Sequence, residues 1–309
     1  MKQGLLTPQA LPFQPFTLAP GHLTFNVKAG SEVQNKTLEG ADIGKDLLVV
    51  LPESNRLRGI QINGGGGEGT CVIIGGSIDL REPGAVTTIR PLTVVGFKWI
   101  YIEGLLLRAG IPGQDVMNWG GHTVNGVKAR CRMQNCFLGA AEGYEVGEEI
   151  HSDCVQATQE TERWEIGRLT GESSYQVFIG HGPESPAGPN VGEWDMREVN
   201  LRGFNPSGEA PETNGYPVFA HGAGNGYPSH WRDAYIDLGA SGRNPVTEAV
   251  YPPTTVDAVE GFKSNDGGKT LVPVRAGSTG LIHVSPPPGG DFVLPADVGV
   301  GYVNTVGYR

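Results

Sequence analysis

The stretch Cys131-Arg132-Met133-Gln134-Asn135-Cys136-Phe137-Leu138 contains the pattern that decides the fold. Its apolar residues stand at Met133, Cys136 and Leu138, with one more at Cys131. The same spacing recurs, clearly or weakly, at Leu57-Ile60-Ile62, Gly75-Ile78-Leu80, Ile102-Leu105-Leu107, Ile166-Leu169-Gly171, Met196-Val199-Leu201 and Asp233-Ile236-Leu238. The last members are 18, 27, 31, 33, 30 and 37 residues apart. An imperfect period of this size is typical of stacked repeats that share one core.

The composition favours an all-β chain with many tight turns. Glycine accounts for 48 of the 309 residues, proline for 23, and charged residues for 18%. Short runs such as Leu47-Leu48-Val49-Val50 and Gln176-Val177-Phe178-Ile179 are typical of strands, and no segment sustains a helical period. The repeat steps fit a parallel β-helix with three short strands per turn. The glycine-rich run at 63–70 lacks the Lys-Ser/Thr ending of a phosphate-binding loop, and we interpret it as a flexible corner.

Three segments follow from the repeat. Residues 1–24 are rich in proline and predict an extended N-terminal arm or cap. Residues 25–258 carry the repeat and predict the parallel β-helix. In residues 259–309 the repeat stops, and short apolar runs between Gly and Pro clusters predict a small C-terminal β module that closes the end of the coil or joins chains into a trimer. Loops inserted between repeats often gather on one side and carry binding.

Charge and hydropathy narrow the classes of partner and the locations that we expect for this protein. The net charge of −10 disfavours nucleic acid, whose phosphates an acidic surface repels. No run of 18 apolar residues exists, so we expect no membrane insertion. The N-terminus does not look like a secretory signal. Either a signal was removed before the numbering begins, or the protein is released by lysis or within a particle. The starting methionine favours the second alternative, and we expect a place on a virion or other extracellular surface. The four cysteines fit no zinc motif, and we expect reduced core cysteines and no metal site built from them.

The densest polar region runs from residue 142 to residue 165 and contains the phrase His151-Ser152-Asp153-Cys154-Val155-Gln156. Two carboxylates about 5–10 Å apart can hydrolyse a glycosidic bond, one as the acid and one as the nucleophile or base. Glu148 or Glu149 with Asp153 could form such a pair, and His151 could tune it. Two alternatives stay open, namely a solvated acidic loop without a cofactor and a calcium ion held by several carboxylates.

Flat aromatic rings and amides in or beside the loops predict a sugar-binding groove. Aromatic faces suit the apolar faces of sugar rings, and amide groups bind hydroxyls. His181 and His221 follow equivalent strands and could line the same groove. The candidate substrate-binding residues are Trp119, Tyr144, Gln156, Tyr175, His181, His221 and Tyr227. Trp164, Trp194 and Trp231 lie on the repeat itself, and we assign them to packing.

The repeat over residues 25–258, together with the phrase at 151–156, resembles the right-handed parallel β-helix superfamily, which includes pectate lyases, polygalacturonases and bacteriophage tailspikes. The pair Asp153-Cys154 resembles part of the Asp-Asp-Cys turn of polygalacturonases, with Ser152 in place of the first Asp. Gly180-His181-Gly182 resembles their Gly-His-Gly, although it follows a strand here. The resemblance implies a right-handed, single-stranded coil.

The layout of an arm, a repeat body and a C-terminal module is closest to that of phage tailspikes. It implies a homotrimeric spike or fibre protein that binds host surface polysaccharide and attaches to a particle through its N-terminal arm. The alternative is a glycan-degrading enzyme of the same fold. For that alternative a hydrolase fits better than a lyase, because no lysine base lies between Lys128 and Lys263. A purely structural particle component is the third hypothesis.

Overall fold

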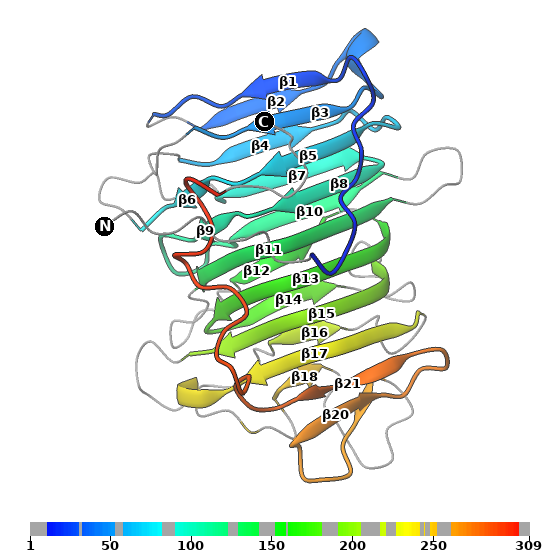
Figure 1. Ribbon diagram of the computed structural model, residues 1–309, viewed down its shortest axis with the longest axis vertical. Helices are drawn as coiled ribbons and strands as arrows, with labels where there is room; N and C mark the ends of the chain where they lie inside the picture. The colour runs from blue at the N-terminus through cyan, green and yellow to red at the C-terminus, as the bar shows by residue number, and fades with distance from the viewer. Residues whose placement is uncertain are drawn as a thin grey trace.

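The computed structural model is an all-β molecule in which two long sheets lie face to face (Figure 1). It describes residues 11–30, 33–52, 58–81, 90–122, 129–141, 152–158, 160–180, 191–204, 217–220, 227–241, 244, 248–251 and 261–302. Within these residues the only helical elements are two 3-10 turns, η1 (Gly40–Asp42) and η2 (Gly239–Ser241). The all-β prediction is therefore confirmed.

The large sheet has 13 strands. They are β1 (Leu23–Asn26), β3 (Leu47–Val50), β5 (Thr70–Ile74), β6 (Ser77–Asp79), β8 (Trp99–Glu103), β9 (Leu106–Arg108), β11 (Arg130–Ala141), β13 (Thr161–Ser173), β15 (Val191–Gly203), β17 (Ser229–Asp237), β19 (Phe262–Lys263), β20 (Thr270–Pro273) and β21 (Thr279–His283). Described pairings are parallel except that β20 runs antiparallel to β19 and β21.

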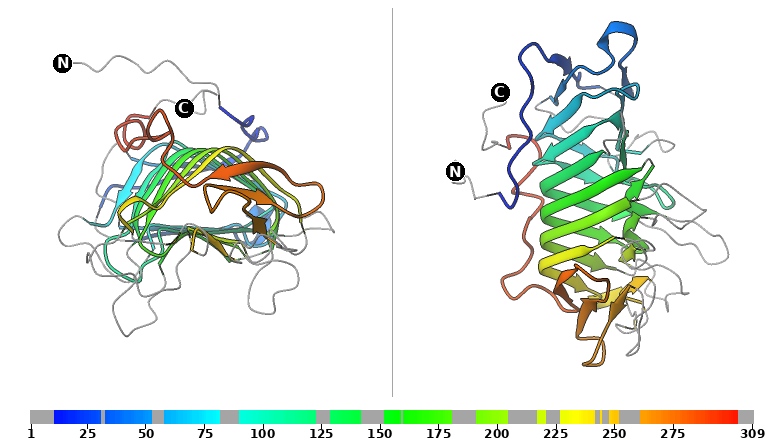
Figure 2. Two further views of the ribbon diagram at one scale, coloured as in Figure 1. Left: turned by 90° about the horizontal axis from the view of Figure 1, so that it is seen from below. Right: turned by 90° about the vertical axis from the view of Figure 1, so that its right-hand side faces the viewer.

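The small sheet has eight strands, all paired in parallel. They are β2 (Gln34–Thr37), β4 (Ile60–Asn63), β7 (Leu92–Phe97), β10 (Met117–Gly121), β12 (Asp153–Ala157), β14 (Gln176–Gly180), β16 (Val218–Ala220) and β18 (Val250–Tyr251). From β1 to β18 the chain visits the two sheets in turn, and the large sheet arches over the flatter small one (Figure 2).

The register gives a more regular repeat than the sequence pattern did. Leu23 pairs with Leu47 and Leu47 with Cys71, two steps of 24 residues. In the middle of the sheet, Cys131 pairs with Ile100 and with Trp164, steps of 31 and 33 residues. Short N-terminal repeats thus give way to longer ones.

Three copies of the pattern need correction. Ile60 and Ile62 lie on β4 of the small sheet, so the first copy does not belong to the column of Met133. The copies that begin at Gly75 and Asp233 are displaced by two residues, because Ile78 pairs with Leu107 and Ile236 with Leu201. A displacement by two keeps every side chain on its own face, so the hydrophobic pattern alone cannot exclude it.

A column of bends sets the register of the large sheet. Gly104, Asn135, Arg168, Glu198 and Asp233 occupy equivalent positions and all have left-handed backbone angles, with φ between 45° and 73°. Glycine, asparagine and aspartate tolerate this conformation best. Each long strand is therefore two straight segments with a bend between them, which together with the small-sheet strand makes three segments per repeat.

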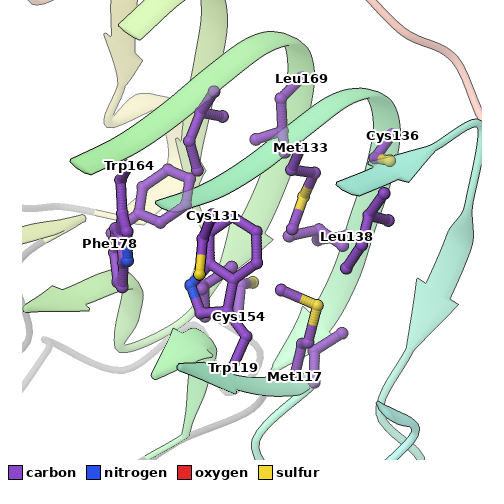
Figure 3. Packing of buried hydrophobic residues seen from close by; sticks show 14 of the residues in the cluster. Met117, Trp119, Cys131, Met133, Cys136, Leu138, Cys154, Trp164, Leu169 and Phe178 are labelled. Carbon is purple, nitrogen blue, oxygen red and sulfur yellow. The ribbon is translucent and has the colours of Figure 1, made fainter. Parts of the chain in front are cut away.

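The core fills the space between the sheets. Met133, Cys136 and Leu138 are fully buried there, as predicted, and so are Cys131 and Cys154 (Figure 3). Cys71 is buried as well. Burial raises the pKa of the Cys131 and Cys136 thiols to about 12, which keeps them protonated. A row of indole rings contains Trp119, Trp164, Trp194 and Trp231, with neighbouring ring centroids 5.1 to 6.3 Å apart. The packing role predicted for the last three is confirmed.

The first and the last described segments of the chain both lie on the outer face of the large sheet (Figure 2). Residues 11–22, here called the N-terminal strap, run from β15 to β1. Their contacts begin at Arg197, whose Nη1 donates to the carbonyl of Pro12 (3.1 Å), and end at Asp46, which accepts from the amide of Ala19 (2.6 Å). Residues 284–302, the C-terminal strap, run in the same direction from β21 to the start of β6, where the amide of Val300 donates to Ser77 Oγ (3.1 Å).

The predicted boundary at 258/259 lies outside the described residues. Beyond it, β21 pairs with β17, so the large sheet continues into the C-terminal region before the strap turns back. No helix in the described part of the chain is long and apolar enough to cross a bilayer.

Candidate functional site

The outer face of the small sheet carries a column of uncharged polar side chains, which we call the polar ladder. Its five members are Asn35, Gln61, Thr93, Asn118 and Gln156, each the register partner of the next. The strand neighbours of the last four members, such as Ile60 and Ile62, lie in the core, so alternation sends these four outward, and Asn35 is itself exposed. Successive rungs are about 4.8 Å apart, the strand spacing of a sheet.

The ladder offers donors and acceptors in a line. Asn35 and Gln61 are exposed, and Thr93 and Gln156 are partly so. Asn118 is buried, and with its carboxamide oxygen facing Arg90 it accepts from Nε (3.1 Å) and Nη1 (2.9 Å), while its nitrogen donates to Gln156 Oε1 (3.3 Å). Asn118 therefore holds Gln156 in place.

The outer face of the large sheet is different in kind. Beside the N-terminal strap it carries charged pairs, including Arg132 with Glu165 (2.6 Å) and Arg163 with Asp195 (2.6 Å). These charges are matched within the chain, and the two straps occupy much of the surface. The ladder, by contrast, has hydrogen-bonding groups without charge.

A second polar column stands where the small-sheet strands begin. Arg90 Nε donates to Asp115 Oδ2 (2.7 Å), and the other carboxylate oxygen of Asp115 accepts from the amide of Asp153 (3.1 Å). Asp153 pairs in register with Gln176 on β14. Among the described residues, Asp153 Oδ1 and Gln176 Oε1 are buried oxygens without a hydrogen-bond partner.

The environment of Asp153 favours its protonated form. Burial raises the pKa of this carboxyl well above 3.8, the negative charge of Asp115 raises it further, and Arg90 opposes the shift. Two carboxyl groups with different environments are the usual arrangement of an acid and a base. Asp153 is, however, only 1% exposed, so a substrate has no direct access to it in this arrangement.

We expect Asp153→Asn to change how stability depends on pH. Below pH 3.8 both states of the wild-type protein hold the proton. Above pH 3.8 the unfolded chain releases the proton while the folded protein still holds it. The free energy of unfolding therefore falls by up to about 1.4 kcal/mol per pH unit, until the pH passes the raised pKa of the folded state. The variant lacks this loss and gains stability relative to wild type as the pH rises.

Urea unfolding of both proteins at several pH values between 4 and 8 measures this difference. All other titrating groups contribute nearly equally to the two proteins and cancel. Parallel stability profiles would show that Asp153 ionises in the folded protein as it does in the unfolded chain.

The other predicted site residues do not gather at one place among the described residues. Glu148, Glu149, His151, Tyr144, His181 and His221 lie outside the described residues. Trp119 needs correction, because its ring is fully buried in the core and offers no face to a sugar. Tyr175 is also buried, at 7% exposure, between β13 and β14. Tyr227 is partly exposed but precedes β17 of the large sheet, away from the ladder, which contains Gln156 alone of the predicted set.

Sequence reasoning missed Asp115, Arg90 and most of the ladder. One signal was present, because Gln114-Asp115-Val116-Met117 has the same order of polar, acidic and two apolar residues as Ser152-Asp153-Cys154-Val155. The described residues contain no group of three or more His, Cys, Asp or Glu side chains arranged to hold a metal ion.

The comparisons with known proteins supply no relative. No protein-family model, curated protein or solved structure matches this chain.

Proposed function

We propose that the chain is a right-handed, single-stranded parallel β-helix whose small-sheet outer face binds surface polysaccharide. The alternating, parallel sheets and their inward apolar columns support the coil. Crossovers between parallel strands of one sheet are right-handed in about 98% of cases, which supports the hand. In this role the protein is a spike or fibre of a phage-like particle, assembled as a homotrimer on the particle surface.

The polar ladder is the observation that carries this proposal. Amide side chains each present a donor and an acceptor, and hydroxyls present both, so the ladder matches the hydroxyl groups of a sugar chain laid along the stack. A linear polymer laid along the stack can contact the exposed rungs Asn35 and Gln61 and the partly exposed rungs Thr93 and Gln156. Buried Asn118 supports this surface by holding Gln156. Because the ladder is uncharged and the chain has a net charge of −10, we expect a neutral or weakly charged glycan and no nucleic acid.

The alternative is a glycan hydrolase, and one observation favours it. Asp115 and Asp153 are two neighbouring carboxyl groups, one paired with Arg90 and one with a raised pKa, which suits base and acid roles. Burial of Asp153 argues for the binding protein instead. The enzyme requires Asp153 to become accessible.

The double variant Gln61→Ala/Gln156→Ala tests the binding proposal. Each lost hydrogen bond weakens binding by about 0.5–1.5 kcal/mol, so we expect affinity for an immobilised neutral polysaccharide to fall about tenfold or more. Biolayer interferometry against neutral, uronate-containing and lipopolysaccharide samples provides the measurement. Asn265→Ala, an exposed amide on the β19–β20 turn, is the matched control and should bind as wild type does.

The same samples are assayed for new reducing ends. Products that disappear in Asp153→Asn would establish the hydrolase. Failure of wild type to bind any of the polysaccharides, or equal binding by the double variant and Asn265→Ala, would contradict the proposal that the ladder is a glycan site.

A further inference from the structure

A line of buried hydrogen bonds begins at the N-terminal strap. Gln134 of β11 is fully buried, and its carboxamide binds both backbone groups of Phe13, accepting from the amide (3.1 Å) and donating to the carbonyl (2.9 Å). The same Nε2 donates to the hydroxyl of Tyr101 on β8 (2.8 Å). The position of the N-terminal strap and that of Tyr101 therefore depend on one side chain.

The line continues to the C-terminal strap. Tyr101 donates to Glu103 Oε2 (2.5 Å), and the hydroxyl of Tyr302 donates to Glu103 Oε1 (2.7 Å). Tyr302 also accepts from Asn135 Nδ2 (2.8 Å). Glu103 is fully buried, so its carboxylate depends on these two phenols to replace water. Both straps are thus joined to the buried carboxyl group of Glu103 through the sheet beneath them.

Recesses in the sheet receive both straps. A Cβ on Gly104 would lie 2.1 Å from the ring of Tyr302, and one on Gly167 would lie 2.9 Å from the side chain of Pro12. The absence of side chains at these two positions makes room for the straps. The straps are therefore seated in shaped sites.

Apolar contacts connect the straps as well. A cluster outside the large sheet contains Phe16 and Leu18 from the N-terminal strap and Phe292, Val293, Val298 and Tyr302 from the C-terminal strap, packed around Val72, Tyr101 and Phe137. Phe16 lies 6.0 Å from the ring of Tyr101. Tyr101 is consequently shared by the hydrogen-bond line and the apolar cluster.

We propose that the two straps dock cooperatively, so that release of the N-terminal strap loosens the C-terminal strap and the reverse. Both equilibria share Glu103, Tyr101 and Gln134. Loss of either strap leaves a buried polar group of this set without its partner, which weakens the seat of the other. A binding partner that displaces the N-terminal strap from the sheet therefore also weakens the docking of the C-terminal strap.

Hydrogen–deuterium exchange of the full chain tests the coupling. Tyr302→Phe removes a hydroxyl and leaves the ring, and we expect faster exchange both in the C-terminal strap and at the Phe13 amide of the N-terminal strap, by about fivefold or more. Phe13→Ala should raise exchange at Gly299 and Val300 by a similar factor, because coupling is reciprocal.

Asp291→Asn is the matched control, because it weakens the C-terminal strap at its ion pair with Arg202 (3.1 Å), away from the shared groups. It should loosen exchange near Asp291 without affecting Phe13. In a Gln134→Leu background, Tyr302→Phe should no longer affect the N-terminal strap. The proposal is overturned if Tyr302→Phe accelerates exchange in its own strap and leaves that of Phe13 at the wild-type rate.

Discussion

Replacing Trp164 by alanine is expected to lower the free energy of unfolding by about 3–5 kcal/mol, the cost of emptying a large aromatic site. The ring is fully buried, and its centroid lies 5.5 Å from that of Trp119, 5.1 Å from that of Trp194 and 6.2 Å from that of Phe178. These neighbours belong to both sheets, so the cavity would remove the contacts that join the two sheets at the centre of the core. Equilibrium unfolding in urea measures the loss.

Two further substitutions show whether packing is the cause. The indole nitrogen of Trp164 has no hydrogen-bond partner among the described residues, so Trp164→Phe should cost less than about 2 kcal/mol. Trp99→Ala removes an indole that is 38% exposed and whose ring lies tilted against Phe16, with centroids 5.4 Å apart, and we expect a loss of about 1 kcal/mol. Equal losses for Trp164→Ala and Trp99→Ala would show that the row of indole rings is not the centre of the core.

The inward positions of the repeat were predictable because they depend on local alternation. Met133, Cys136 and Leu138 could be assigned to the core from spacing alone, and they are buried there. The register was not predictable in the same way. In a correctly aligned copy the bend lies two residues after the first apolar residue, as Asn135 lies after Met133. Gly75 and Asp233 are themselves bend residues, but the hydrophobic pattern placed them at the position of that first apolar residue. Backbone conformation decides the register, and hydrophobicity does not report it.

In the candidate site, too, residues within one short phrase could be predicted, and contacts between distant segments could not. Gln156 and Asp153 could be singled out because they share one short polar phrase. The partners of Asp153 could not, since Asp115 is 38 residues earlier and Arg90 is 25 residues before Asp115. Only the lengths of the intervening loops, which no pattern fixes, bring them into one column. Residues 1–24 could be predicted as an extended arm or cap from their prolines. The docking of the two straps across the large sheet could not, because a segment that lies across many strands has no alternation of its own.

The glycine run at 63–70 is tightly packed, and its interpretation as a flexible corner is wrong. A Cβ on Gly69 would lie 2.1 Å from the carbonyl oxygen of Lys45 and 2.7 Å from its carbonyl carbon. On the other side, the carbonyl of Gly69 accepts from the amide of Lys98 (3.1 Å). Backbone from the preceding and following repeats therefore encloses this residue, and neither can move away without breaking the stack.

We accordingly expect Gly69→Ala to lower the free energy of unfolding by about 3 kcal/mol, the upper range of overpacking. Gly289→Ala is the matched control, because a Cβ there meets no atom within 4 Å. The two substitutions restrict the unfolded chain equally, and this restriction should stabilise the Gly289→Ala protein by about 0.4–1 kcal/mol. Effects of opposite sign in urea unfolding would identify the backbone contact between repeats as the cause, whereas a similar small change in both variants would mean that the run at 63–70 is loose after all.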